Sequence, residues 1–272
     1  MMYELFLLFP NTRPVFKIYI EEMEIYKHIK LIYGNCANRY NINDEFVEIY
    51  IYKKDWLYEI RFLDNKFIIK NKEKTIQALE YIIMNKCKSY DKMFCIHAGC
   101  VGYKNKIFAF VGRSNSGKST ITAYLSLNDF TYISDDKIFL NTKYPRTTAM
   151  FRPIFLRHNS LDVLEKYNLY PEIKNYCFGS YERLIYTPTK IKKEIQDLPI
   201  LIFIERVGEE LMIREVTGSE KFYLLQENMI FTKDMMNIHS IASCLRNIKT
   251  YKIRYQKLDD IKNIMETGVS EL

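Results

Sequence analysis

Residues 106–119 constrain the fold more than any other part of the sequence. Positions 106–111 form a compact apolar run, KIFAFV, as expected of a buried strand. The next eight residues, 112–119, fit the pattern G-x-x-x-x-G-K-S. Residues 119–127 then carry apolar side chains at helical spacing. This succession predicts a strand–loop–helix unit inside an α/β fold.

The residue types of this loop suit the binding of a nucleotide's phosphates. Glycines let the backbone turn so that successive N–H groups point at phosphate oxygens, and the following helix adds its positive end. Lys118 is expected to reach the β- and γ-phosphates, and the hydroxyl of Ser119 to coordinate Mg²⁺. An ordinary Gly/Ser turn is the alternative, and the flanking strand and helix argue against it. The candidate nucleotide-binding residues are Gly112, Arg113, Ser114, Asn115, Ser116, Gly117, Lys118, Ser119 and Thr120.

Two adjacent carboxylates, Asp135 and Asp136, follow a predicted strand at 130–133. One helix and one strand separate them from Lys118, so the chain can return them to the loop. One carboxylate could take the proton of an attacking hydroxyl while the other holds Mg²⁺. Asp pairs also occur in plain turns at strand ends, and the nearby loop favours the functional interpretation.

His97 is the second candidate near the loop, 15 residues before Gly112 (112 − 97). It is expected on or beside the strand that precedes the loop strand. A neutral imidazole there could form a hydrogen bond with a carboxylate and tune its proton affinity. On spacing alone a structural role for a single histidine is the more common one.

Together these segments resemble the catalytic domain of the HPr kinase/phosphorylase family. The resemblance rests on His97-Ala98-Gly99-Cys100-Val101, on residues 112–120 and on Tyr132-Ile133-Ser134-Asp135-Asp136, and it covers roughly residues 90–260. Residues 152–157 and the strand around 204–206 add to it. The sequence looks most similar to short relatives of that enzyme, including kinases encoded with ribosomally made peptides such as lasso peptides.

The resemblance implies a P-loop kinase core that transfers phosphate from ATP, with Mg²⁺, to a serine-type hydroxyl. It implies Asp135 as the base, Asp136 near the metal, and His97 near the catalytic carboxylate. Lys118 and Ser119 match the family's phosphate-binding Lys and its Mg²⁺ ligand. The implied acceptor is a peptide or small protein, and members of the family can be homo-oligomers.

The sequence departs from the family in two places. Asn115 stands where the family usually has Gly, although Asn tolerates a left-handed backbone better than most residues. The later Glu-x-Arg-Gly-type signature is not recognisable, which argues against HPr as the acceptor. Glu205 is a candidate for a further acidic group, and Arg113, Arg152 and Arg157 are candidates for stabilising the transferring phosphoryl group. For Glu205 an ordinary role on the surface of a hairpin is favoured, and for each of the three arginines a plain salt bridge is equally compatible.

The sequence predicts two parts, a β-rich N-terminal unit at 1–89 and a P-loop kinase domain at 90–272. Residues 1–70 are interpreted mainly as strands, followed by a helix at 75–84. Further on, 201–205 and 211–215 are expected to form a hairpin. The N-terminal unit could hold a peptide acceptor at a sheet edge, or serve only as a scaffold.

Composition narrows the class of protein. The chain is 48% hydrophobic and 27% charged, which is ordinary for a globular protein. It has no apolar stretch long enough to span a membrane, and its six cysteines form no Cys-x-x-Cys pair. We therefore expect a cytoplasmic protein with reduced cysteines that does not associate with a membrane. The net charge of +7 suits an acidic or phosphorylated partner, and no nucleic-acid motif accompanies it.

Three alternatives remain open at this point. The acceptor could be a small hydroxylated metabolite such as free serine. The protein could hydrolyse a nucleotide as a switch or transport ATPase, although it lacks the Leu-Ser-Gly-Gly-Gln and Asn-Lys-x-Asp motifs of those classes. It could also be a regulatory module that binds a nucleotide without chemistry.

Overall fold

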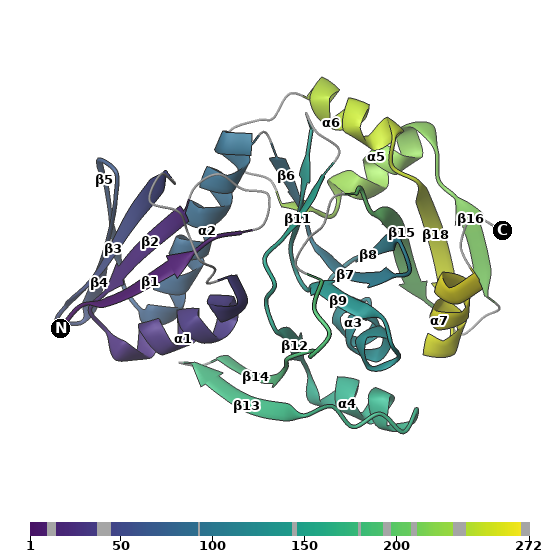
Figure 1. The fold of residues 1–272 in the computed structure, drawn as a ribbon, viewed down its shortest axis with the longest axis horizontal. Helices are drawn as coiled ribbons and strands as arrows, with labels where there is room; N and C mark the ends of the chain where they lie inside the picture. Colours follow the sequence, from purple (N-terminus) through teal and green to yellow (C-terminus); the bar gives the residue numbers. More distant parts are fainter. Residues whose placement is uncertain are drawn as a thin grey trace. The chain divides into compact units, whose positions relative to one another are not determined.

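A computed structural model of the chain describes residues 1–9, 15–36, 45–91, 93–142, 146–178, 181–192, 197–207, 211–230 and 238–267. It has a mixed α/β fold with several sheets (Figure 1). The chain divides into two compact units, which are described separately. Unit 1 contains Met1–Met93, Met150–Arg152 and Cys177–Glu182. Unit 2 contains Phe94–Ala149, Pro153–Tyr176 and Arg183–Leu272.

Unit 1 is built on a five-stranded sheet that two helices contact. β1 pairs antiparallel with β2, β2 runs parallel to β3, and β3, β4 and β5 form an antiparallel meander. The strands are β1 (Tyr3–Leu7), β2 (Val15–Ile20), β3 (Phe46–Lys54), β4 (Leu57–Phe62) and β5 (Asn65–Ile69). The helices are α1 (Met23–Tyr33) and α2 (Lys72–Asp91), with the short 3₁₀ turn η1 (Gly34–Cys36) after α1.

Alternation explains the strand β3 of unit 1, and the helix α1 corrects the prediction of mainly strands for residues 1–70. In β3, Val47, Ile49 and Ile51 are buried while the residues between them are not, the pattern of a sheet covered on one face. The prediction of mainly strands overlooked α1, which buries Ile25, Ile29 and Ile32 along one side. The helix expected at 75–84 is longer, because Asn71 caps it through a hydrogen bond from the N–H of Lys74 (2.9 Å).

The main sheet of unit 2 has six strands in the order β16-β18-β15-β8-β7-β9. β8, β15 and β18 run parallel, so their carboxyl ends meet at one edge. β7 lies antiparallel between β8 and β9, and β16 is antiparallel to β18 at the outside. The strands are β7 (Ala98–Tyr103), β8 (Lys106–Val111), β9 (Thr131–Ser134), β15 (Ile200–Arg206), β16 (Met212–Glu215) and β18 (Thr250–Tyr255).

Among the described residues, two smaller sheets and five helices accompany this main sheet, although the segment Cys177–Glu182 of one small sheet belongs to unit 1. One small sheet has the order β11-β10-β6-β17 and the other β12-β14-β13. Their strands are β6 (Met93–Ile96), β10 (Ile138–Asn141), β11 (Thr147–Ala149), β12 (Ile154–Leu156), β13 (Ile173–Phe178), β14 (Tyr181–Tyr186) and β17 (Met229–Ile230). The helices are α3 (Lys118–Leu127), α4 (His158–Glu165), α5 (Gly218–Gln226), α6 (Ile238–Arg246) and α7 (Leu258–Thr267). None of the helices in the described ranges has the length and apolar character needed to cross a bilayer.

The hairpin expected from 201–205 and 211–215 is wrong. Both segments are strands, but β18 lies between them and pairs with each. β15 is an almost continuous apolar strand, so it needs a neighbour on both sides, and it finds them in β8 and β18. β16 is mostly exposed and takes the edge position. Proximity in sequence suggested the hairpin, and burial of the apolar strand decided the pairing.

The helix α3 packs very closely on the sheet through Gly99 of β7. A Cβ at Gly99 would lie 2.1 Å from the Thr122 Oγ1 and 3.3 Å from the carbonyl oxygen of Lys118. On the same side of the sheet, Phe108, Phe110 and Tyr124 join a large buried cluster. The absence of a side chain at position 99 therefore sets the distance between the first turns of α3 and the strand that begins just after His97.

We expect Gly99→Ala to destabilise the protein by about 1–3 kcal/mol, because the added methyl group overlaps a buried threonine in a packed interior. Gly102→Ala is the matched control on the same strand, since a Cβ there would meet only ordinary contacts at 3.6–3.7 Å. Urea unfolding of the two variants measures the difference. Equal stability of the two variants would contradict the close packing at Gly99.

Candidate functional site

The glycine-rich loop at 112–117 connects β8 to α3, and two of its residues adopt left-handed backbone angles. Asn115 has φ of 67° and Gly117 has φ of 95°, the latter immediately before the first helical residue. The expected strand–loop–helix order is therefore the one observed. Asn tolerates this region better than most residues, which allows Asn115 to make the turn.

The loop is held against the ends of two neighbouring strands. A Cβ at Gly112 would lie 3.1 Å from the carbonyl oxygen of Ile204 in β15, and one at Gly117 would lie 2.9 Å from the hydroxyl of Tyr255 in β18. The Tyr255 hydroxyl also donates to the carbonyl of Ser116 (3.4 Å). The Oγ of Ser116 is buried and has no hydrogen-bond partner among the described residues. The loop thus presents a buried polar group and the first N–H groups of α3, which have no carbonyl earlier in the helix.

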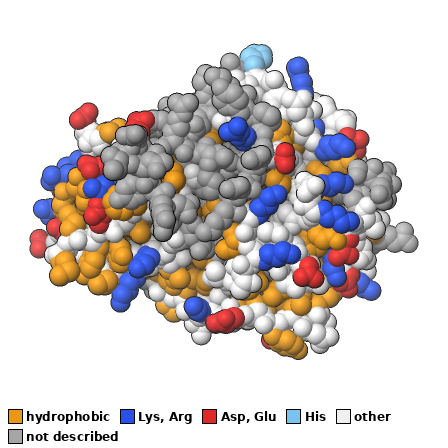
Figure 2. All heavy atoms as spheres, viewed as in Figure 1, with side chains coloured by type: hydrophobic (Ala, Val, Ile, Leu, Met, Phe, Trp, Pro, Cys, Tyr) orange, Lys and Arg blue, Asp and Glu red, His pale blue; other side chains and the backbone are white. Residues whose placement is uncertain are grey.

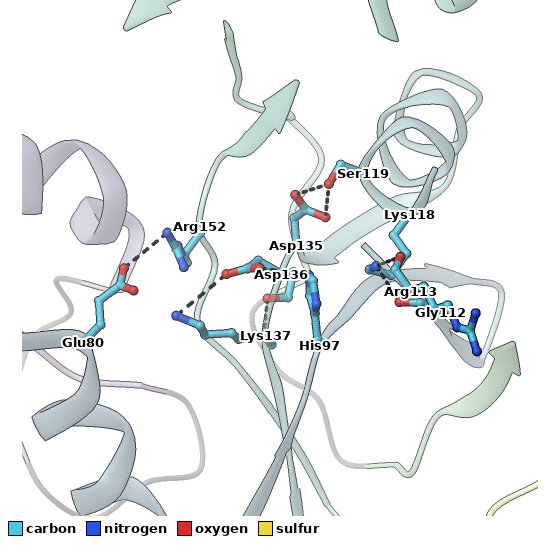
Figure 3. A network of polar contacts seen from close by, with 11 residues as sticks. Glu80, His97, Gly112, Arg113, Lys118, Ser119, Asp135, Asp136, Lys137 and Arg152 are labelled. Atoms are coloured by element: carbon cyan, nitrogen blue, oxygen red, sulfur yellow. Dashed lines mark hydrogen bonds and ion pairs between the residues drawn. The ribbon is translucent and has the colours of Figure 1, made fainter. Parts of the chain in front are cut away.

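Lys118 folds back over the loop (Figure 3). Its Nζ donates to the carbonyls of Gly112 (2.7 Å) and Arg113 (2.9 Å). Burial lowers the pKa of Lys118, and the charges of Asp135 and Asp136 oppose this effect. The side chain is a cation held close to the loop by two neutral oxygens and by carboxylates further away. Such a cation favours an added anion, because carbonyl contacts leave its charge uncompensated.

Ser119 and Asp135 face each other across the start of α3 and the end of β9. The Ser119 Oγ lies 2.9 Å and 3.1 Å from the two carboxylate oxygens of Asp135. Asp135 is only 3% exposed. The backbone behind it is fixed by a tight turn, in which the Lys137 N–H donates to the Asp135 carbonyl (2.9 Å) and the Ser134 hydroxyl to the Lys137 carbonyl (2.8 Å). A hydroxyl and a carboxylate at this place are the hard oxygen ligands that Mg²⁺ prefers.

Asp136 points toward a different partner, His97. Its φ of 72° turns its side chain away from that of Asp135, and its Oδ1 lies 3.1 Å from the His97 Nε2. Lys137 adds a cation beside Asp136, with its Nζ 3.7 Å from the Oδ2 of that residue. His97 stands between β6 and β7, where its backbone N–H donates to the backbone carbonyl of Asn228 (2.9 Å). His97 and Asp136 are both more than a third exposed, so a molecule arriving from solvent can reach them.

The structure brings five of the predicted site residues together, and the other candidates make contacts elsewhere. Lys118, Ser119, Asp135, Asp136 and His97 converge at the carboxyl end of β8. Arg113 is largely exposed and lies 3.8 Å from Glu227, and the Thr120 hydroxyl donates to that of Ser160 (3.1 Å). Arg152 belongs to unit 1, where it pairs with Glu80 (3.3 Å). Arg157 precedes α4, and Glu205 pairs with Lys252 and Arg254.

Two residues at the site were missed from the sequence. Lys137 could have been found, because it directly follows the Asp pair. Tyr255 could not, because it touches the loop from a strand 139 residues further along the chain.

Within the described ranges, no group of three His, Cys, Asp or Glu side chains could hold a metal ion without other ligands. Mg²⁺ is commonly held by one or two carboxylates together with substrate phosphates. The Ser119–Asp135 pair fits that arrangement, in which the phosphates of a nucleotide supply the remaining ligands.

Comparison with solved structures finds a neighbour of low similarity. No protein-family model and no curated protein matches the chain. A solved structure, the HPr(Ser) kinase/phosphatase from Coxiella burnetii, matches with a TM-score of 0.33 and 12% sequence identity. The match covers 65% of this chain and 94% of that chain.

We expect Gly117→Ala to destabilise the protein by about 1–2 kcal/mol, because an alanine is strained in the left-handed region and its Cβ would press on the Tyr255 hydroxyl. Ser114→Ala, at an exposed position of the same loop, should leave stability within about 0.5 kcal/mol of the unaltered protein. Chemical unfolding followed by circular dichroism measures both. A Gly117→Ala protein as stable as Ser114→Ala would contradict the strained turn.

Proposed function

We propose that the protein is a kinase that transfers the γ-phosphate of ATP, with Mg²⁺, to a serine-type hydroxyl of a peptide or small protein. The observation that carries the proposal is the convergence of Lys118, Ser119, Asp135, Asp136 and His97 around the start of α3. These groups supply what phosphoryl transfer requires: a cradle and cation for the phosphates, oxygen ligands for a metal, and a carboxylate for the acceptor's proton.

The loop and Lys118 form the phosphate end of the proposed site. The first N–H groups of α3 and the positive end of that helix favour bound phosphate. Lys118 would exchange its two loop carbonyls for phosphate oxygens. Little covalent chemistry is needed from the protein, because positioning and charge neutralisation account for most of the catalysis in phosphoryl transfer.

The contacts favour a division of labour between the two carboxylates. Asp135 is buried against Ser119, which suits the metal side. Asp136 is reachable from solvent and is oriented by His97, which suits a base that takes a proton from an acceptor hydroxyl. The resemblance to HPr kinase implies the opposite assignment, with Asp135 as base and Asp136 near the metal. Asparagine variants of the two carboxylates, made one at a time, show which of them acts as the base and which lies near the metal.

The function is tested by phosphate transfer from γ-labelled ATP with Mg²⁺ to a serine- or threonine-containing peptide encoded beside the gene. We expect label on a hydroxyl side chain, and its loss in Lys118→Ala, because removal of this cation weakens both binding and transfer. Lys262→Ala, on the surface of α7, is the control and should transfer normally. Steady ATP hydrolysis without labelled acceptor would point to an NTPase. Transfer to free serine would point to a metabolite kinase, and ATP binding without chemistry to a regulatory module.

Asp136→Asn should reduce transfer by about 10²–10⁴-fold while leaving the affinity for ATP with Mg²⁺ nearly unchanged, as expected when a general base is removed. Asn also tolerates the left-handed backbone at this position, so the fold is preserved. Asp135→Asn should instead weaken the dependence of ATP binding on Mg²⁺. Calorimetric titration with and without Mg²⁺, together with transfer rates, measures both. The reverse result would assign the base to Asp135.

A further inference from the structure

The edge strand β16 and its neighbour β18 line a groove that the proposed reaction does not use. Its volume is about 230 Å³ and its lining side chains are those of Met212, Arg214, Lys252 and Arg254. Figure 2 shows Lys and Arg side chains gathered over this part of unit 2. Three of the four lining side chains are therefore cationic, and the fourth is a flexible apolar one.

The register of the two strands produces this cluster. Arg214 pairs with Lys252 and Met212 with Arg254 across the ladder, so all four side chains project on one face. Tyr251, Ile253 and Tyr255 project on the other face and belong to the buried cluster around α3. The alternation that builds the core of unit 2 thus also places three cations side by side on the opposite surface.

Two carboxylates of the same chain already lie against these cations. Glu220 accepts from both Nη atoms of Arg214. Glu205 receives Lys252 (3.2 Å) and Arg254 (3.1 Å) on the same oxygen, Oε2. Three cations thus face two carboxylates among the described residues, which leaves a net positive charge. These contacts also show that carboxylates fit the geometry of the groove.

Arg254 keeps most of its donor capacity. Its Nε donates to Glu205, and within the described residues its two Nη groups make no further hydrogen bond. A guanidinium with both Nη groups available matches the two oxygens of a carboxylate, because its donors form a planar fork. Met212 is 46% exposed and offers an apolar contact beside that fork.

We propose that the groove is a binding site for a carboxylate-bearing anion, held by Arg254 and Lys252 with Arg214 at the rim. The anion is either a free small carboxylate or an acidic side chain of an extended polypeptide.

The test is calorimetric titration of the full chain with two probes. One is succinate, and the other is the peptide acetyl-Thr-Glu-Thr-Glu-Thr-amide, with its Gln-substituted twin as control. We expect Arg254→Gln to weaken binding by about tenfold or more, as for the loss of a charged hydrogen bond. Lys262→Gln on α7 and Lys118→Ala in the loop should bind as the unaltered protein does. The second of these controls excludes anion binding at the glycine-rich loop.

Each outcome either identifies the source of the bound carboxylate or overturns the proposal. Binding of succinate that Arg254→Gln removes assigns the site to a free carboxylate. Binding of the Glu peptide alone, lost in both its Gln twin and Arg254→Gln, assigns it to an acidic polypeptide. No binding of either probe, or binding that Arg254→Gln leaves unchanged, overturns the proposal. Circular dichroism confirms that the Arg254→Gln protein is folded.

Discussion

The candidate site depends on the close approach of α3 to β7 at Gly99. The first turns of α3 carry Lys118 and Ser119, and β7 begins one residue after His97. With no side chain at position 99, the carbonyl of Lys118 lies 3.3 Å from where a Cβ would be. This contact fixes the start of the helix relative to the strand, and therefore the loop relative to the histidine. β9, which hydrogen-bonds to β7 on its other edge, adds the two carboxylates from the same side.

The local parts of this arrangement could be predicted from the sequence, because each is determined by residues close together in the chain. The run at 106–111, the glycines after it and the apolar spacing in 119–127 indicate strand, loop and helix. The Asp pair follows the next strand directly. The sequence did not reveal which strands pair when they lie far apart in the chain. The β18 strand separates β15 from β16 because an apolar strand needs two neighbours, and Tyr255 reaches the loop only as a result. The helix α1 was missed because aromatic and β-branched residues around it favour strands equally well.

The two adjacent carboxylates stand in different environments although they are neighbours in the chain. The left-handed backbone at Asp136 is the cause, since it turns one side chain toward Ser119 and the next toward His97. One carboxylate is enclosed and the other is open to solvent. Neighbouring acids that differ in this way suit separate chemical tasks, because one is enclosed beside a hydroxyl and the other can meet a molecule from solvent.

The contact of Lys118 with its own loop affects the enthalpy with which an anion would bind there. The ammonium group already donates to the carbonyls of Gly112 and Arg113. An arriving anion therefore takes over donors that are engaged, and hydrogen bonds are exchanged rather than gained. The enthalpy from this side chain is then small, and the favourable change comes from placing a negative charge beside a cation whose direct hydrogen-bond partners are neutral oxygens. A ligand of the same shape without that charge would meet a lysine whose hydrogen bonds are already made, so this side chain favours charged ligands over neutral ones.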